Sequence, residues 1–463
     1  MNRFAAPPVS DADWRGLAGS VSGRVLRPAD TGFTGASAPL NKRWSATPAG
    51  VVSVTDTEDV RSALAWVRET GVGVVVRGGG HSYGGYSTGQ GLVLDLRALD
   101  TVDVDPSTGL VTVGGGASTG AVYAALQPHD LVFPLGNGDT VGVAGLALGG
   151  GSAAVSRKLG LTADTLVGTA VMTADGSLLE CDEHRNTDLY WASRGGGGGN
   201  FGVTVSMTFQ AQPAPLGATC LLLWDGAHAQ PVFEALQRVM LDAPDELATR
   251  LGLSTTGDAT SVSVVGLYQG HAAALRDLLA PVLATATPLS VDIADRTFWG
   301  AKDYLAHETA GGAFAVRTNF IIEPLPAAAV GIIESFVDKW PRGHNPDGGG
   351  VALFAWGGAV NRIAPADTAF VHRDAVSLLA LDTSWTGEDP PETVAAHLRW
   401  LADLREALSP HTTPHAYQNF IDPELPDWRT AYYGANYPRL AEVKQRHDPE
   451  NLFRHAQSIT SEC

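Results

Sequence analysis

The stretch VVVRGGGHSYGGYSTGQGLVLD, residues 74–95, limits the fold of this chain more than any other segment. A β-branched run leads into three consecutive glycines and His81, and a second apolar run ends at Asp95. Because glycine lacks a Cβ, a planar ligand or a pyrophosphate can lie directly against such a loop. From these residues alone, a glycine-rich hairpin with a hydrogen-bonded histidine is an equally good interpretation.

Length, charge and cysteine content set the class of protein. At 463 residues the chain exceeds one ordinary core, so two or three packed units are expected. The net charge of −18 argues against a nucleic-acid partner or an anionic membrane. Cys181, Cys220 and Cys463 form neither a disulfide framework nor a zinc site. The sequence shows no signal-peptide core and no apolar run of about 18 residues, so a cytoplasmic enzyme of undetermined oligomeric state is expected.

The first 205 residues alternate short predicted strands with glycine-rich loops. A helix over 57–70 followed by a strand over 74–77 makes a βαβ-like unit that delivers the His81 loop. Two further glycine clusters occupy residues 135–151 and 194–205. We therefore predict an α+β fold whose first domain wraps backbone around an extended ligand. Other strands are predicted at 51–54, 92–95, 101–104, 110–113 and 166–172, and a helix at 119–126.

The sequence pattern changes after Gln210, where the glycine-rich loops end. Apolar runs at 220–224, 261–267 and 351–356 alternate with helical patterns at 231–240, 272–283 and 327–340. This alternation predicts a second domain over 206–405, an antiparallel sheet covered by helices on one side. A helix over 391–408 leads into an aromatic-rich segment, 406–463, whose closing helix is expected to dock on the first domain.

Several familiar sites are excluded or disfavoured. The chain has no P-loop and no nucleophile elbow, and RGGGGGNFG is followed by β-branched residues where a dinucleotide-binding fingerprint needs a helix. His411 and His415 are separated by Pro414, so no helical face presents both to a metal ion, and no metal site is predicted. Cys181 is most simply a core residue.

Five motifs in the same order make the chain resemble the berberine-bridge-enzyme-like FAD-linked oxidases, which have the PCMH-type FAD-binding fold of vanillyl-alcohol oxidase. The resemblance implies a two-part FAD-binding domain at 1–205, a substrate domain at 206–405 and a C-terminal segment, 406–463, returning to the first. The motifs are RGGGHSYGGYS at 77–87, VGVAGLALGGG at 141–151, DLYWASRGGGGGNFGV at 188–203, TAFVHR at 368–373, and YYGANYPRL…DPENLF at 432–453.

The resemblance also assigns the cofactor contacts. It implies that His81 is bonded covalently to the flavin, which raises the flavin's reduction potential and prevents its loss. The loop Arg77, Gly78, Gly79, Gly80, His81 and Ser82 is expected to cradle the FAD diphosphate. Gly142, Gly145, Gly149 and Gly150 are expected to line the flavin and ribityl chain, and Gly202 and Val203 to lie near the ADP half.

One departure from the family concerns the second flavin bond. Many members attach the flavin again through the cysteine of a G-x-C-P-x-V-G motif, and here Gly138 occupies that position. Cys181 and Cys220 lie outside the motif. We therefore expect His81 to be the only covalent attachment.

Val141 matches the family position that controls access of oxygen. Valine there is associated with oxidases, and bulkier residues with dehydrogenases, although a β-branched core residue would look the same in the sequence. The resemblance thus favours an oxidase, with a flavin dehydrogenase using another acceptor as the alternative.

The resemblance points to Tyr417, in Tyr417-Gln418-Asn419-Phe420, as the catalytic base. A phenol with a pKa of about 10 needs a neighbouring cation or amide to act at neutral pH. Asn419 is expected to hydrogen-bond near the flavin, and Phe420 replaces a tyrosine frequent in the family. A packing role for Tyr417 remains the alternative.

The expected reaction is FAD-dependent oxidation of a small molecule with O₂ as acceptor and H₂O₂ as product. A natural-product intermediate that is oxidised or oxidatively cyclised is the first substrate hypothesis, and a carbohydrate or oligosaccharide is the second. A flavin-fold protein without redox turnover is the non-enzyme alternative. The substrate itself is not predicted, because family motifs are sparse in residues 206–405.

Overall fold

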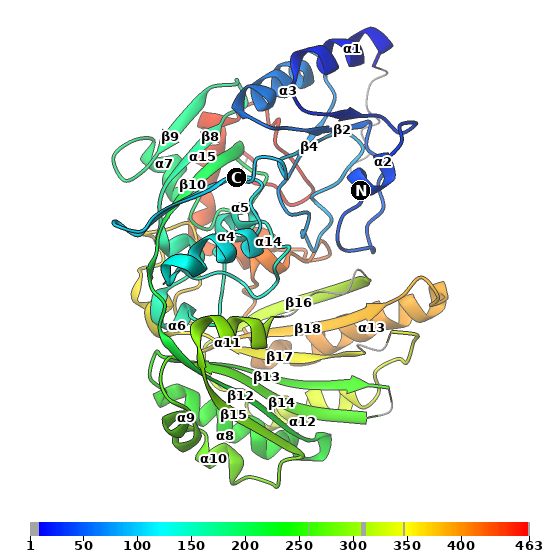
Figure 1. Cartoon of the computed structure of the whole chain (residues 1–463). Coiled ribbons are helices and arrows are strands. Elements are labelled where there is room, and N and C mark those ends of the chain that lie inside the picture. Colours follow the sequence, from blue (N-terminus) through cyan, green and yellow to red (C-terminus); the bar gives the residue numbers. More distant parts are fainter. Residues whose placement is uncertain (1–8, 258, 307–311, 346–347, 462–463) are drawn as a thin grey trace.

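The computed structural model describes residues 9–257, 259–306, 312–345 and 348–461. Two small sheets form a first unit, a seven-stranded antiparallel sheet forms a second, and the end of the chain returns to the first (Figure 1). The α+β architecture predicted from the sequence is confirmed. None of the described helices is long and apolar enough to cross a membrane.

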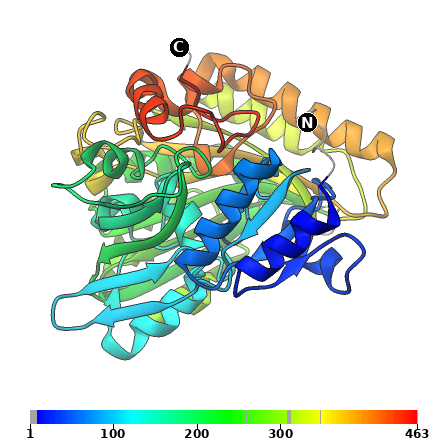
Figure 2. The same cartoon turned by 90° about the horizontal axis from the view of Figure 1, so that it is seen from above.

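The first sheet has the strand order β1-β2-β4-β3, and β2 and β3 both pair with β4 in parallel. Parallel strands need a crossover, which here is α3 (Thr57–Thr70), begun by the Asp56 cap and ended by Gly71. The predicted helix and the strand that follows it are confirmed. Helix α1 (Asp11–Ser20) packs beside α3 (Figure 2). The strands are β1 (Val25–Leu26), β2 (Gly50–Ser53), β3 (Val74–Arg77) and β4 (Leu92–Asp95).

The second sheet is antiparallel, with the order β5-β6-β10-β8-β9. Its central strand β10 pairs with β6 and β8 and runs to Gln210, so the expected domain boundary after residue 205 falls inside a strand. We place the boundary after the short strand β11 (Gln212–Pro213). The strands are β5 (Val102–Asp105), β6 (Leu110–Gly114), β8 (Leu166–Met172), β9 (Leu178–Cys181) and β10 (Val203–Gln210), and the main helices are α4 (Thr119–Leu126), α5 (Val143–Leu148) and α7 (Thr187–Ala192).

The seven-stranded sheet has the order β15-β12-β14-β13-β17-β18-β16, and every neighbouring pair is antiparallel. The three apolar runs predicted as strands fall on β12, β14 and β17. The strands are β12 (Leu216–Asp225), β13 (Leu247–Thr256), β14 (Ala259–Tyr268), β15 (Ser290–Thr297), β16 (Ala313–Ile321), β17 (Gly349–Ala355) and β18 (Ser377–Trp385).

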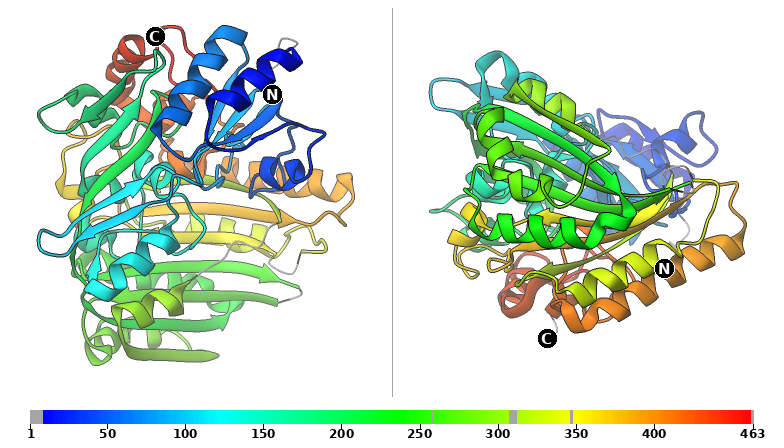
Figure 3. Two further views of the ribbon diagram at one scale, coloured as in Figure 1. Left: turned by 45° about the horizontal axis from the view of Figure 1, so that its top comes forward. Right: turned by 90° about the horizontal axis from the view of Figure 1, so that it is seen from below.

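The two faces of this sheet serve different purposes because side chains alternate along each strand. On β13, Leu251 and Leu253 are buried in the core under the helices, whereas Arg250, Gly252 and Ser254 face a cavity toward the first unit. Helices α12 and α13 lie side by side across the apolar face (Figure 3). The helices on this face are α8 (Ala229–Asp242), α9 (Ala272–Leu278), α10 (Ala280–Leu283), α12 (Ala327–Val337) and α13 (Pro391–Leu408).

One predicted helix is interrupted. The pattern at 272–283 predicted a continuous helix, but α9 ends at Leu278 and α10 begins at Ala280. Pro281 stands at the start of α10, where its missing N–H costs nothing, while inside a longer helix it would remove a hydrogen bond.

The C-terminal segment packs on the first unit. Helices α14 (Trp428–Tyr433) and α15 (Tyr437–His447) share a core with α7. The buried Lys444 ammonium donates to the carbonyl oxygens of Asn200 (2.7 Å) and Phe453 (2.6 Å) and pairs with Asp448 (2.7 Å). This one cation therefore joins the closing helix to the loop that precedes β10.

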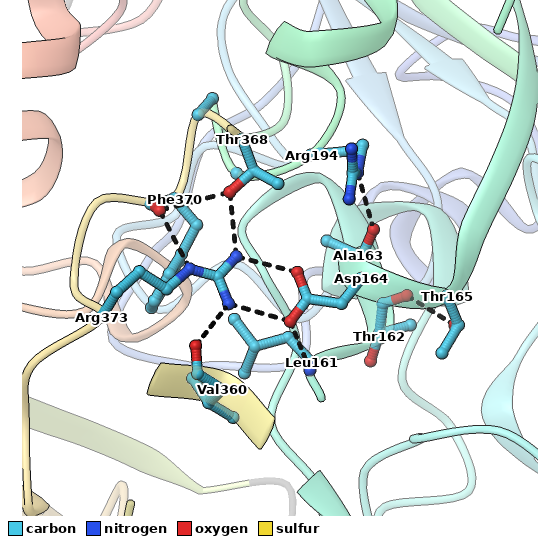
Figure 4. A network of polar contacts seen from close by, with 12 residues as sticks. Leu161, Thr162, Ala163, Asp164, Thr165, Arg194, Val360, Thr368, Phe370 and Arg373 are labelled. Atoms are coloured by element: carbon cyan, nitrogen blue, oxygen red, sulfur yellow. Dashed lines mark hydrogen bonds and ion pairs between the residues drawn. The ribbon is translucent and has the colours of Figure 1, made fainter. Parts of the chain in front are cut away.

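A buried ion pair between Arg373 and Asp164 joins the first unit to the unit of the seven-stranded sheet (Figure 4). The Arg373 guanidinium donates to both carboxylate oxygens of Asp164, at 2.9 and 2.8 Å, and their side chains are 1% and 4% exposed. Arg373 also donates to the carbonyl oxygens of Phe370 and Val360 and to the Thr368 hydroxyl. Such a pair adds little net stability, but removing one partner typically costs about 3–5 kcal/mol, so its role is to fix how the units meet.

Candidate functional site

A cavity of about 2020 Å³ lies between the first unit and the polar face of the seven-stranded sheet. Its lining draws on all three parts of the chain: the glycine loops, the sheet face and the C-terminal segment. This volume is larger than that of a typical small-molecule pocket, so the cavity has room for an extended ligand together with a second molecule.

Two glycine loops meet backbone to backbone in the cavity wall. A Cβ on Gly79 would lie 2.3 Å from the Gly142 nitrogen, and a Cβ on Gly142 would lie 2.4 Å from the Gly79 nitrogen. Both positions therefore require glycine. Gly80, the residue directly before His81, has a φ of +79°, a backbone conformation that also favours glycine.

Most residues assigned to the cofactor or to catalysis from the sequence do line this cavity. They are Gly78, Gly79, Gly80, His81, Ser82, Gly138, Val141, Gly142, Gly145, Gly202, Tyr417 and Asn419.

Four of the assigned residues lie behind the lining instead. The Arg77 guanidinium is buried against Asp95 at 2.9 Å, where it ties β3 to β4. Gly149 is covered by the Asn419 amide and Gly150 by the Phe370 ring, and Val203 is a core residue of the first unit. These four residues can shape the site through packing, since their neighbours separate them from the cavity.

His81 stands at the rim of the joined glycine loops. Its Nε2 lies 2.9 Å from the Thr140 hydroxyl, which belongs to the loop that carries Gly138. Burial lowers the pKa of His81, so the imidazole is neutral at pH 7. Cys181 and Cys220 are buried in separate cores and do not line the cavity, and Cys463 lies outside the described residues.

Tyr417 is fixed from two sides and is only 1% exposed. Its hydroxyl accepts hydrogen bonds from the Gly151 N–H (3.0 Å) and the Asn419 side-chain amide (3.1 Å). The amide neighbour expected from the sequence is therefore present. Burial nevertheless raises the pKa of Tyr417 above its ordinary value, because desolvation outweighs the hydrogen bonds with Asn419, Gly151 and Ser152.

Sequence reasoning missed Asp382, which lies on the cavity face of β18. Burial raises the pKa of this carboxyl to about 6, against the opposing charge of Arg250. Its side chain makes no hydrogen bond or ion pair with the described residues. A carboxylate directly after the apolar run LLAL, at a position alternating with buried leucines, was the signal that could have identified it.

Aromatic rings form the wall beside Asp382. Tyr83 stacks on Phe420 with ring centroids 5.0 Å apart and meets Phe314 edge to face at 4.9 Å. Burial, followed by the negative charge of Asp382, raises the pKa of Tyr83 to about 12. The phenol therefore stays protonated and can donate to a bound molecule.

Several polar atoms in the lining residues lack a partner. Among the described residues, the indole nitrogen of Trp356, the amide oxygen of Gln418 and the hydroxyl of Thr88 are buried without a hydrogen bond. Buried polar groups are normally satisfied, so these atoms indicate a ligand that completes the site. No cluster of three or more metal-ligating side chains occurs in the described part of the chain.

Comparisons with known protein families place the chain among flavoproteins. A family model described as FAD binding domain matches residues 48–182, and one described as berberine and berberine like matches residues 416–460. An uncharacterized FAD-linked oxidoreductase of Bacillus subtilis is 33% identical over 450 residues, covering 95% of this chain and 97% of the relative. A chitooligosaccharide oxidase of Gibberella zeae is 30% identical, covering 90% of this chain and 88% of the relative.

Solved structures of similar shape agree with this placement. BBE-like 1 of Physcomitrella patens superposes with a TM-score of 0.88 at 26% identity, covering 97% of this chain and 99% of that one. A chitooligosaccharide oxidase superposes with a TM-score of 0.86 at 25% identity, with the same coverage.

The contact between the glycine loops can be tested by adding one methyl group. Gly79→Ala should separate the loops, lower the melting temperature and reduce the FAD content of the purified protein at least about tenfold, because the methyl group would overlap backbone atoms. Gly136→Ala is the matched control, since its Cβ would meet nothing within 4 Å in the same cavity lining. Equal FAD content in the two variants would contradict the importance of the contact.

Proposed function

Because the chain belongs to the berberine-bridge-like family of FAD-linked oxidoreductases, we propose that it is an oxidase that oxidises or oxidatively cyclises a small-molecule natural-product intermediate. The observation that carries this proposal is the convergence of His81, the glycine loops, Tyr417 and Asp382 on one cavity. The partners of the reaction are this substrate and O₂.

The cavity fits FAD on two grounds. The joined loops around Gly79 and Gly142 leave backbone uncovered by side chains, as a diphosphate requires, and the unpartnered Trp356 and Gln418 atoms offer a donor and an acceptor. The loops 78–82, 138–145 and 197–202 would hold the cofactor. When bound, FAD supplies the acceptor for a hydride from the substrate and passes the electrons to O₂, giving H₂O₂.

The acid–base roles follow from the shifted pKa values of Asp382 and Tyr417. At pH 7 the Asp382 carboxyl, with a pKa of about 6, is mostly ionised, whereas Tyr417, with a raised pKa, is protonated. Asp382 is therefore the better proton acceptor for a substrate hydroxyl. The Tyr417 oxygen accepts from Gly151 and Asn419, and its O–H is the group proposed to donate to the substrate oxygen.

Oxygen is proposed as the acceptor because of Val141. This residue lines the cavity in the loop that contacts the Gly79 turn. A dehydrogenase with another acceptor is the alternative of the same family. The carbohydrate alternative is supported by relatives named chitooligosaccharide oxidase and xylooligosaccharide oxidase.

The proposal is tested by the products of the reaction and by the reoxidation of the reduced flavin with O₂. Photoreduced holoenzyme mixed with air-saturated buffer should regain its oxidised flavin spectrum within seconds, with release of H₂O₂. A panel of aromatic and polycyclic alcohols should yield peroxide faster than cello-, xylo- and chitooligosaccharides. Flavin that stays reduced for many minutes would indicate a dehydrogenase, and rapid peroxide from an oligosaccharide would establish the carbohydrate alternative.

The acid–base assignment predicts a pH profile. The rate should rise with pH through about 6 as Asp382 ionises, and Asp382→Asn should lose that limb and about 10²–10⁴ in rate. The folded-state pKa lies above the ordinary 3.8, so ionisation destabilises the fold as pH rises from about 4 to 6. Asp382→Asn should therefore melt no lower than the unmodified protein at pH 7. A larger rate loss in Tyr417→Phe, with the Asp382 variant near normal, would make Tyr417 the base.

The attachment of the flavin can be tested by denaturation. His81 is proposed as the only covalent attachment, because Gly138 replaces the second attachment residue and both described cysteines are buried elsewhere. After acid precipitation the flavin absorbance should remain with the protein pellet, and in His81→Ala it should appear in the supernatant. Free FAD released from the unmodified protein would refute covalent attachment.

A further inference from the structure

The sheet face of the cavity carries a cation, Arg250, that no described side chain contacts directly through a hydrogen bond or ion pair. Arg250 is exposed, its side chain lies on the cavity side of β13, and its guanidinium stands 5.6 Å from the centroid of the Phe354 ring. It forms no hydrogen bond or ion pair with the described residues. By contrast, Arg157 in the same lining donates to the carbonyl oxygens of Trp356 and Ala243.

The strand register places Arg250 and Asp382 at opposite ends of a trough. Arg250 is level with Phe354 on β17, and Asp382 is level with Gly350, four residues along the same strand. Ordinary strand spacings put these two ends about 13 Å apart along the strands and about 10 Å apart across them. The row between them has almost no side chains, since it consists of Gly252, Ala352 and Ala380.

This floor leaves the two charges facing each other across open space. The guanidinium lies over the Phe354 ring, and no described residue accepts a hydrogen bond from its N–H groups, so these groups are available to an incoming ligand. A planar guanidinium matches a carboxylate with two parallel hydrogen bonds. Asp382 at the other end would repel such a group, so only one orientation of an anionic substrate is favourable.

We propose that the substrate carries a carboxylate that Arg250 binds, while the carbon to be oxidised lies at the Asp382 end of the trough. This inference rests on the proposed function, because it takes the Asp382 end as the site of reaction. Arg250 is thus a residue that determines substrate specificity and orientation.

Binding of small probes to the holoenzyme tests the proposal. Benzoate and 3-phenylpropanoate should bind at least about tenfold more tightly than benzamide and 3-phenylpropanamide, measured by calorimetry. Arg250→Met should weaken carboxylate binding at least about tenfold and change amide binding less than about twofold. Arg250→Lys should recover only part of the loss, because an ammonium lacks the planar pair of donors.

Each other outcome overturns the proposal. Carboxylates that bind no better than amides, or that do not bind at all, would remove the anion site. Equal losses for carboxylates and amides in Arg250→Met would show that Arg250 acts only through Asp382. Tighter binding of phenyl phosphate than of either carboxylate would replace the carboxylate by a phosphate.

The controls separate this inference from the proposed function. Arg276→Met removes an exposed arginine on the helix-covered face and should leave all affinities unchanged. FAD content and air reoxidation of the same samples report on the oxidase proposal independently. A protein that holds FAD and reoxidises but shows no carboxylate preference would refute the Arg250 site alone.

Discussion

The whole site depends on a contact in which two backbone segments touch without any side chain between them. Gly79 and Gly142 approach so closely that a methyl group on either would overlap the other loop. This contact brings the βαβ unit that carries His81 against the loop that carries Gly138 and Val141. Regular secondary structure on both sides holds the loops, since β3 ends directly before one and α5 begins directly after the other.

The two faces of the seven-stranded sheet have separate roles. Leucines and valines on one face pack under the helices, and this core provides the stability of the unit. The opposite face is then free to carry polar and small residues, including Arg250, Asp382 and three near-bare positions between them. Stability and recognition therefore use alternate residues of the same strands, and either can change with little effect on the other.

Local pattern predicted much of the first unit, because caps and glycines act within a few residues. The helix at 57–70 was predictable from Asp56, its apolar spacing and Gly71, and the His81 loop from three adjacent glycines. Arg250 and Asp382 were not found, since their placement on one face of the cavity depends on the register of three strands far apart in the sequence. Gly149 and Gly150 were assigned to the cofactor by motif alone, but the tertiary packing of Asn419 and Phe370 covers them. Features set by neighbouring residues were therefore predictable from the sequence, and features set by tertiary packing were not.

The buried Lys444 has a consequence for how the protein can be made. Its ammonium joins the loop at Asn200 to the strand-like end at Phe453, which itself pairs with Val74 beside the first glycine loop. A nascent chain that has emerged only to residue 440 holds every glycine of the cavity but lacks the Lys444 hydrogen bonds. Completion of the binding site thus waits until residues 444–453 have been synthesised, and the amount of flavin retained by a preparation also measures how much of it contains them.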